Sequence, residues 1–304
     1  MTSVLYDSPG RRAKQRNVIY TIVFLVVLAL ALWWVLATMA DKDQLAAAKW
    51  KPFVTDSEVW TTYLLPGLVD TLKAAALSIV IALPFGAMLG LGRLSDHVWV
   101  RWVSSVVVEF FRSIPVLLLM MFANQLYIQY ADLESDIRPL YAVVTGLVLY
   151  NASVIAETVR AGVLTLPGGQ TDAAKAIGMR KGQTMTSVLL PQAVTAMLPA
   201  LVSQLVVIVK DTALGGAMLG FTELLSRNRQ ITANYGANTI ATLVVIALIY
   251  IVMNYLLTLF ASRLEGRLRR GKNSTGAVVE AGPGGGLKTI PAPATPLGQE
   301  NQPS

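Results

Sequence analysis

Two oppositely charged side chains, Lys210 and Asp211, lie next to each other at the end of a long apolar stretch. If this stretch is a membrane helix that begins near Met197, a rise of ~1.5 Å per residue places the pair about 20 Å from that end. Charges at such a depth are costly and usually face a water-filled cavity or a partner group. Two interpretations stay open: a pathway or gate for a charged solute, and a structural salt bridge to a neighbouring helix.

Three further polar residues in apolar surroundings are candidates for the same pathway: Lys73, Gln204 and Thr212. Lys73 would add positive potential for an anionic solute, but such lysines more commonly extend the amine to the lipid headgroups. Polar residues in membrane helices also often bond a neighbouring helix without lining any pathway. Only some of these candidates are therefore expected to face a solute.

The pattern Glu-x-x-Arg occurs twice, at Glu109–Arg112 and at Glu157–Arg160, each time at the edge of an apolar run. A spacing of three residues puts both charges on one face of a helix. We interpret the four residues as structural ion pairs between helices, which hold an inner gate or a surface that faces a partner.

The residues that most enzymes need for catalysis are scarce in this chain. It has no cysteine, and its one histidine, His97, leaves almost no basis for a metal site or a catalytic triad. A stretch from Gly266 to Lys272 has the spacing of a phosphate-binding loop, but Asn273 replaces the required Ser or Thr. We therefore expect neither an enzyme nor a bound metal or cofactor.

The composition indicates an integral membrane protein. Among 304 residues, 54% are hydrophobic and only 14% are charged, whereas soluble domains have about 25% charged residues. Continuously apolar runs favour membrane helices over strands, and each crossing needs ~20 such residues. The runs predict six transmembrane helices in an all-α fold, and the last two runs must include loop residues: 18–40, 74–92, 113–131, 139–156, 182–209 and 231–262.

The distribution of Lys and Arg predicts that both termini lie in the cytoplasm. The first run is too long for a signal peptide, so we expect it to be retained as a membrane helix. The predicted segments are a basic cytoplasmic N-terminus, an extra transmembrane helix, an external segment, a transmembrane domain and a disordered cytoplasmic tail: 1–17, 18–40, 41–65, 66–270 and 271–304.

The longest predicted cytoplasmic connection covers residues 161–196 and reads as two short helices. Thr171 and Asp172 are predicted to begin the first helix, Gly178 to end it in a left-handed conformation, and Pro191 to end the second. Small side chains in the first helix would let another protein approach closely. The candidate residues of this loop are Gln170, Asp172, Ala173, Ala174, Gly178, Leu190 and Pro191.

This loop resembles the EAA loop of ABC importer permeases, because Asp172-Ala173-Ala174, Gly178 and Leu190-Pro191 occupy the positions of its pattern. Other stretches resemble the polar amino-acid permeases, especially the actinobacterial glutamate permeases, over residues 66–270. They begin at Gly67, Val108, Ala156 and Val209. This sequence differs from the family pattern at two positions. Asp172 replaces the usual Glu, which shortens an acidic side chain, and Ala213 replaces a common Ser, which removes a hydroxyl. The first predicted helix lies outside the five-helix core of that family.

The resemblance implies a transport mechanism and a set of partners. A second permease subunit, identical or homologous, would complete the pathway, and an extracellular binding protein would deliver a polar amino acid such as glutamate. Two ATPase subunits would bind the EAA loops and use ATP and Mg, and no nucleic acid is expected. Two alternatives are a secondary transporter driven by an ion gradient, which would need no EAA loop, and a membrane scaffold without transport.

Overall fold

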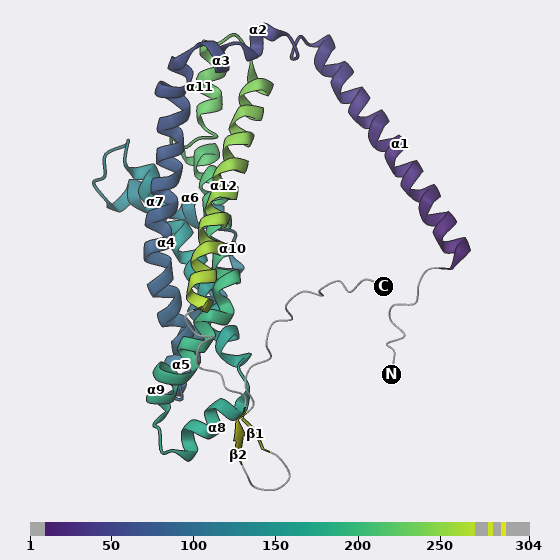
Figure 1. The fold of residues 1–304 in the computed structure, drawn as a ribbon. Coiled ribbons are helices and arrows are strands. Elements are labelled where there is room, and N and C mark those ends of the chain that lie inside the picture. The colour runs from purple at the N-terminus through teal and green to yellow at the C-terminus, as the bar shows by residue number, and fades with distance from the viewer. Residues whose placement is uncertain (1–9, 271–278, 282–286, 290–304) are drawn as a thin grey trace.

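The computed structural model describes residues 10–270, 279–281 and 287–289, and its main body is a bundle of long helices (Figure 1). Within these residues, five helical segments are long and apolar enough to cross a membrane. A sixth span results if α5 and α6, which meet at 100°, count as one. The five segments are Arg11–Asp41, Val59–Arg93, Arg138–Leu164, Lys181–Leu219 and Thr239–Arg263.

The described elements have the following bounds in chain order: α1 (Arg11–Asp41), α2 (Ala47–Trp50), α3 (Pro52–Thr55), a π-helical turn (Val59–Leu64) that continues into α4 (Leu65–Arg93), α5 (Val98–Ser113), α6 (Val116–Tyr130), α7 (Arg138–Leu164), α8 (Gly168–Ala176), α9 (Lys181–Gln183), a second π-helical turn (Thr184–Leu189) that continues into α10 (Leu190–Leu219), α11 (Arg227–Asn234), α12 (Thr239–Arg270), β1 (Val279–Ala281) and β2 (Leu287–Thr289). We call the two ends of the bundle the α8 end and the α11 end. α8 protrudes at one end, and α2, α3 and α11 lie at the other (Figure 1).

Both π-helical turns stand directly before a proline, Pro66 in α4 and Pro191 in α10. A proline has no N–H group and its ring collides with the carbonyl four residues earlier, so a wider turn relieves the clash. The prediction that Pro191 ends a short helix is therefore wrong. The helix runs without a break from Lys181 to Leu219.

The third apolar run, residues 113–131, was predicted as one membrane helix, and α6 (Val116–Tyr130) covers most of it, but a sharp bend that the sequence did not reveal lies at its start. Pro115 separates α5 from α6, and Ile114 before it has an extended backbone at φ −94° and ψ 131°. The residue before a proline is disfavoured in the helical conformation, which explains the bend at this point. The helix before the bend, α5, begins at Val98, within a segment that the sequence had suggested to be a connection.

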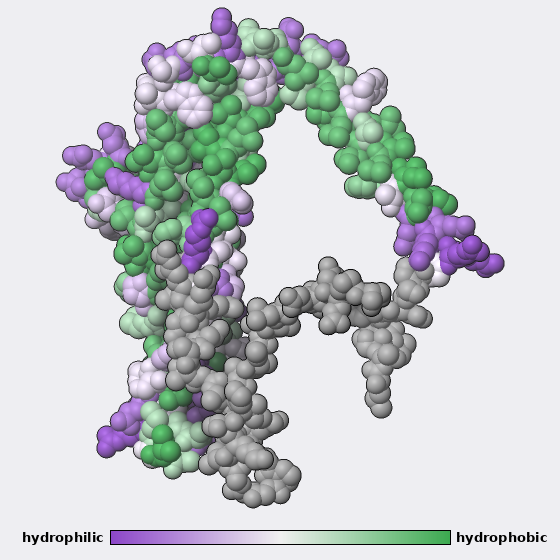
Figure 2. Space-filling model, viewed as in Figure 1, coloured by the Kyte–Doolittle hydropathy of each residue, from purple (hydrophilic) through white to green (hydrophobic). Residues whose placement is uncertain are grey.

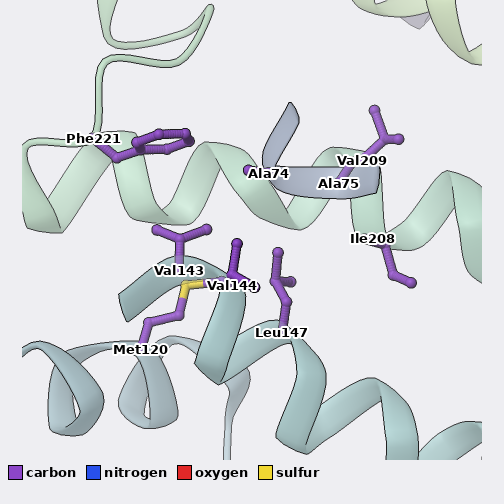
Figure 3. Close-up of a cluster of buried hydrophobic side chains, with 9 residues drawn as sticks. All are labelled: Ala74, Ala75, Met120, Val143, Val144, Leu147, Ile208, Val209 and Phe221. Carbon is purple, nitrogen blue, oxygen red and sulfur yellow. The ribbon is translucent and has the colours of Figure 1, made fainter. Parts of the chain in front are cut away.

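The main core lies where α4, α6, α7 and α10 meet, and small residues of α4 allow the close approach. Ala74 and Ala75 of α4 form one core with Val143 of α7 and Met120 of α6 (Figure 3). The remaining members of this core come from α7, α10 and the segment after α10: Val144, Leu147, Ile208, Val209 and Phe221. This packing fixes the part of α10 that carries Lys210 and Asp211.

α1 stands apart from the bundle, and none of its residues is buried (Figures 1 and 2). The segment after it, 41–65, is folded against the bundle: Trp50 and Phe53 join a core with Leu224 and Ile231. Lys49 also donates hydrogen bonds to the carbonyl oxygens of Gly236 and Ala237. The predicted external segment thus packs closely on α11 and its neighbours.

β1 and β2 form a two-stranded antiparallel hairpin within the segment 271–304, which the sequence predicted to be disordered. Val279 pairs with Thr289, and Ala281 pairs with Leu287. The prediction missed these six residues, because Pro and Gly in the surrounding sequence obscure so short a pattern. The other residues of the predicted tail lie outside the described part of the chain.

Candidate functional site

α8 ends in a tight turn that reverses the chain at Gly178. The N–H of Gly178 donates to the carbonyl of Lys175 at 2.9 Å, and the N–H of Met179 donates to that of Ala174 at 3.0 Å. This is the Schellman arrangement, and it requires a left-handed residue. Gly178 has φ +79°, so its predicted conformation is confirmed. The predicted start of the helix at Thr171 is wrong by three residues, since α8 begins at Gly168, directly after Pro167.

α8 presents a mixed surface away from the bundle. Asp172 and Ala173 are exposed, whereas Ala174 is buried against the second π-helical turn. Gln170 accepts a hydrogen bond from Gln192 at 3.3 Å, which ties α8 to α10. The sequence reasoning missed Ile177, whose side chain is 78% exposed at the tip of the segment. An isolated large apolar residue in a short polar connection was the signal that could have identified it.

The two Glu-x-x-Arg pairs come together at the α8 end. Arg112 bonds Glu109 at 2.9 Å and Arg160 bonds Glu157 at 3.0 Å, each within one helix. We call these four residues, together with Arg93, the ion-pair cluster. The sequence predicted ion pairs between helices, and Arg112 of α5 does lie 3.9 Å from Glu157 of α7, although the two closer contacts each join residues of one helix.

Arg93, which the sequence reasoning left without a role, makes the shortest links between helices. From the end of α4 it bonds Glu157 of α7 at 2.7 Å and Glu109 of α5 at 2.9 Å. Its side chain is only 10% exposed, and Glu157 at 26% is better shielded from water than Glu109 at 50%, so the bond to Glu157 is the more protected of the two. Its position directly after an apolar run was a visible signal, but a lone arginine there also reads as an ordinary end of a membrane helix.

Lys210 lies on the exposed face of α10 and lines an open cavity of about 740 Å³. Tyr250 and Asn254 of α12 line the same cavity, and its other lining residues are apolar. Within the described chain no side chain lies within salt-bridge distance of Lys210. Asp211 beside it is partly buried and makes no salt bridge in that part of the chain either, so among the described residues no salt bridge accounts for the pair.

The other pathway candidates do not gather around Lys210. Gln204 donates a hydrogen bond to the buried Asn151 of α7. Thr212 is fully buried and donates to the carbonyl of Val209 at 2.7 Å. Lys73 is exposed on α4 and belongs to neither the cavity nor the ion-pair cluster. Gln204 therefore joins α10 to α7, Thr212 bonds within α10, and Lys210 alone of the five candidates lines the cavity.

A second residue that sequence reasoning missed is Glu223, which follows α10 and is fully buried. Its carboxylate accepts hydrogen bonds from the N–H groups of Leu225 and Ser226, at 2.6 and 2.7 Å, and from the Tyr250 hydroxyl at 2.9 Å. A Cβ at Gly216 would collide with this carboxylate. A charge outside the apolar runs looked like an ordinary loop residue, so the sequence offered little warning of its burial.

Long apolar helices around a packed core define this molecule as a multi-pass helical membrane protein. Residues 82–270 match the family model described as binding-protein-dependent transport system inner membrane component. The chain is 49% identical to the glutamate transport system permease protein GluD of Corynebacterium glutamicum, over 83% of this chain and 92% of that protein. It is 37% identical to the glutamate/aspartate import permease GltK of Escherichia coli, over 50% of this chain and 70% of that protein.

A solved structure gives the same result. The crystal structure of an amino acid ABC transporter with histidines matches with a TM-score of 0.60 and 27% identity, over 68% of this chain and 95% of that chain. The chain therefore belongs to the family of binding-protein-dependent transport system inner membrane components and is a permease subunit of an amino-acid ABC importer. It is a multi-pass protein of the cell membrane, and ATP hydrolysis lies in a separate subunit. Neither alternative, an ion-coupled transporter or a scaffold, fits this family.

Proposed function

We propose that this permease imports glutamate or a close relative. The names of GluD and GltK support this substrate class. The cavity that Lys210 lines supports it physically, because an ammonium group in apolar surroundings attracts an anionic solute. In this proposal Lys210 faces the pathway, and Asp211 next to it tempers the positive charge.

The proposed topology has six spans, with α5 and α6 counted as one, and both termini in the cytoplasm. Basic residues at the α8 end support this orientation, because cytoplasmic connections carry an excess of Lys and Arg. Those residues include the three arginines of the ion-pair cluster as well as Arg101, Lys175, Arg180 and Lys181. The α8 end is then cytoplasmic, and the α11 end faces outwards.

The single observation that carries the proposed coupling is the protrusion of α8 beyond the helix bundle (Figure 1). A short helix with exposed Asp172, Ala173 and Ile177 is suited to a cleft on an ATPase subunit. Small side chains allow close contact, Ile177 supplies apolar area, and Asp172 supplies a charge. Two ATPases, which use ATP and Mg, would each bind one such loop, from this chain and from a second permease.

The helix from Lys181 to Leu219 provides the mechanical link. It begins next to α8, continues through the π-helical turn and carries Lys210 in its second half. Closure of the ATPase dimer would therefore move both ends of one helix together, and the cavity would open to the outside. This requires that ATP bind the two global states with different affinities. An extracellular binding protein would deliver the amino acid at the α11 end.

The test is to express tagged permease with its candidate partner subunits and to identify the co-purified proteins by mass spectrometry. The complex is then reconstituted in vesicles, and ATP hydrolysis and uptake of labelled glutamate are measured together. We expect an ATPase to co-purify, and we expect the binding protein with glutamate to stimulate hydrolysis. ATP-independent uptake that follows an ion gradient would overturn the proposal.

A further inference from the structure

The turn between α4 and α5, residues 94–97, touches the start of the helix that leads into α10. Lys181 donates a hydrogen bond to the Asp96 carboxylate and a second to the carbonyl of Leu94 at 3.3 Å. The residues joined here are more than 80 positions apart in the chain. Lys181 therefore connects the EAA-like loop to α4 and α5 as well as to α10.

Apolar packing strengthens this connection. Leu94 packs against a cluster whose buried members are Val163 of α7, Leu189 of the second π-helical turn and Ala193 of α10. Two kinds of contact, ionic at the surface and apolar beneath it, thus hold the same two segments together. The hydrogen bond from Lys181 also lowers the pKa of the Asp96 carboxyl, so this group stays charged at neutral pH.

The turn itself is well suited to transmit a displacement. The N–H of Leu94 donates to the carbonyl of Leu91 at 3.0 Å, and that of Ser95 donates to the carbonyl of Gly92 at 3.1 Å. The Ser95 hydroxyl oxygen accepts the N–H of His97 at 3.2 Å. Arg93, which joins α4 to α5 and α7, directly precedes this turn, so a movement of the turn reaches the ion-pair cluster.

Elsewhere the same region is loosely packed. A cavity of about 700 Å³ lies between α8 and the turn, and Lys175 and Met179 line its α8 side. Leu94, Asp96 and Lys181 line the other side of this cavity, and close packing is what transmits a displacement, so the cavity is a poor route from α8 to the turn. The contacts of Lys181 and Leu94 are the ones that can transmit the displacement.

We propose that Lys181 and Asp96 form a clasp through which the EAA-like loop moves α4 and the ion-pair cluster together with α10. Both are positioning residues, and the clasp stays closed throughout the transport cycle. This inference rests on the proposed function, since it names a route for the coupling described there. Without the clasp, the ATP-driven movement would still displace α10, but the displacement of α4 would be smaller.

The first experiment measures glutamate uptake and ATP hydrolysis in the reconstituted complex and takes their ratio. Lys181→Ala should lower the ratio about two- to five-fold, the range expected for loss of one exposed ion pair. Lys181→Arg should retain most of the ratio, and the exchange of charges in Lys181→Asp with Asp96→Lys should restore part of it. Lys14→Ala, at the start of α1, is the matched lysine control and should change nothing.

The second experiment replaces the clasp by a covalent link, which the absence of native cysteines allows. Lys181→Cys with Asp96→Cys should lose coupling like Lys181→Ala. A bifunctional thiol reagent of about the reach of a lysine side chain should then restore it. A direct disulfide is not used, because it would need the two Cα atoms within about 7 Å.

Three results would overturn the proposal while wild-type transport remains intact: an unchanged ratio in every variant, a link that blocks transport, or loss of the co-purified ATPase in Lys181→Ala. The second would show that the contact must open during the cycle. The third would place Lys181 in ATPase docking. Failure of the wild-type complex to transport glutamate would instead contradict the proposed function itself.

Discussion

The charged residues at the α8 end and those in α10 differ in whether the fold gives them ion-pair partners. At the α8 end, three arginines and two glutamates from α4, α5 and α7 satisfy one another over short distances, and Arg93 is nearly buried. In α10, Lys210 opens onto a cavity and forms no ion pair within the described chain.

This difference separates charges that stabilise the subunit from charges that need something beyond it. A cluster whose partners are all in one chain forms when that chain folds. A lysine that one chain leaves without a counter-charge in the membrane is costly unless water, a solute or another subunit compensates it. The contrast therefore supports two proposals: the ion-pair cluster is structural, and Lys210 serves transport.

Arg93→Ala should give the largest loss of stability. It leaves Glu109 and Glu157 without their link to α4, and removal of one member of a shielded ion pair costs about 3 kcal/mol. Arg101→Ala is the control, because that side chain is exposed and bonds only the carbonyl of Ser95. Thermal unfolding in detergent measures both, and equal midpoints for the two variants would contradict the structural role of the ion-pair cluster.

Glu223→Ala should cost somewhat less, about 2 kcal/mol, because it leaves buried N–H groups of Leu225 and Ser226 without an acceptor. Glu223→Gln keeps one acceptor oxygen, but Leu225 and Ser226 bond to different oxygens of Glu223, so the NH2 group of Gln would face one of these donors and only part of the loss should be recovered. The same unfolding assay compares the two variants. A midpoint for Glu223→Ala equal to that of the wild type would contradict a structural role of this carboxylate.

Gly178→Val should strain the turn after α8 by about 1 to 2 kcal/mol, because a β-branched residue is disfavoured at positive φ. The spans should still insert, but the ATPase should no longer co-purify and uptake should fall. Gly182→Val is the matched control, since Gly182 is helical and has open space around it. Normal uptake by Gly178→Val would show that this turn does not set the docking geometry.

The smallest effect is expected at the α11 end. The hydrogen bond from Tyr235 to Asp56, at 2.8 Å, and burial raise the pKa of the Tyr235 hydroxyl to about 12. A raised folded pKa means that this contribution to stability is complete below the ordinary value of 10.0 and is lost as the pH rises towards 12. Tyr235→Phe has no hydroxyl to ionise, so its stability should fall less as the pH rises from 10 to 12. Unfolding midpoints between pH 9 and 12 would test this, and identical pH profiles would contradict it.

The sequence was sufficient for the class of fold and for Gly178, because apolar run length and left-handed glycine both follow from local chemistry. It did not reveal the bend at Pro115, and it wrongly ended a helix at Pro191, so the two prolines have opposite outcomes. The chain bends sharply at Pro115 but passes Pro191 as a continuous helix, because a π-helical turn absorbs the clash. Only tertiary packing decides between these outcomes.

The candidate site shows the same limit. The spacing predicted that Glu109 lies beside Arg112 and that Glu157 lies beside Arg160, because residues three positions apart lie on one face of a helix. It could not reveal Arg93 as their link or the burial of Glu223, because both depend on segments far away in the chain. Nor could the sequence show that Gln204 bonds Asn151 of α7, and its place in a pathway stays a prediction.

The most direct test of the account is glutamate uptake by Lys210→Ala and by Lys210→Ala with Asp211→Ala, each with the co-purified ATPase measured alongside. We predict that Lys210→Ala keeps its ATPase but loses uptake about tenfold, as expected when a charged contact is removed. The double variant should remain equally impaired, since its pathway still lacks the ammonium group. Full recovery of uptake in the double variant would show that Lys210 and Asp211 merely balance each other, and it would contradict the assignment of Lys210 to transport.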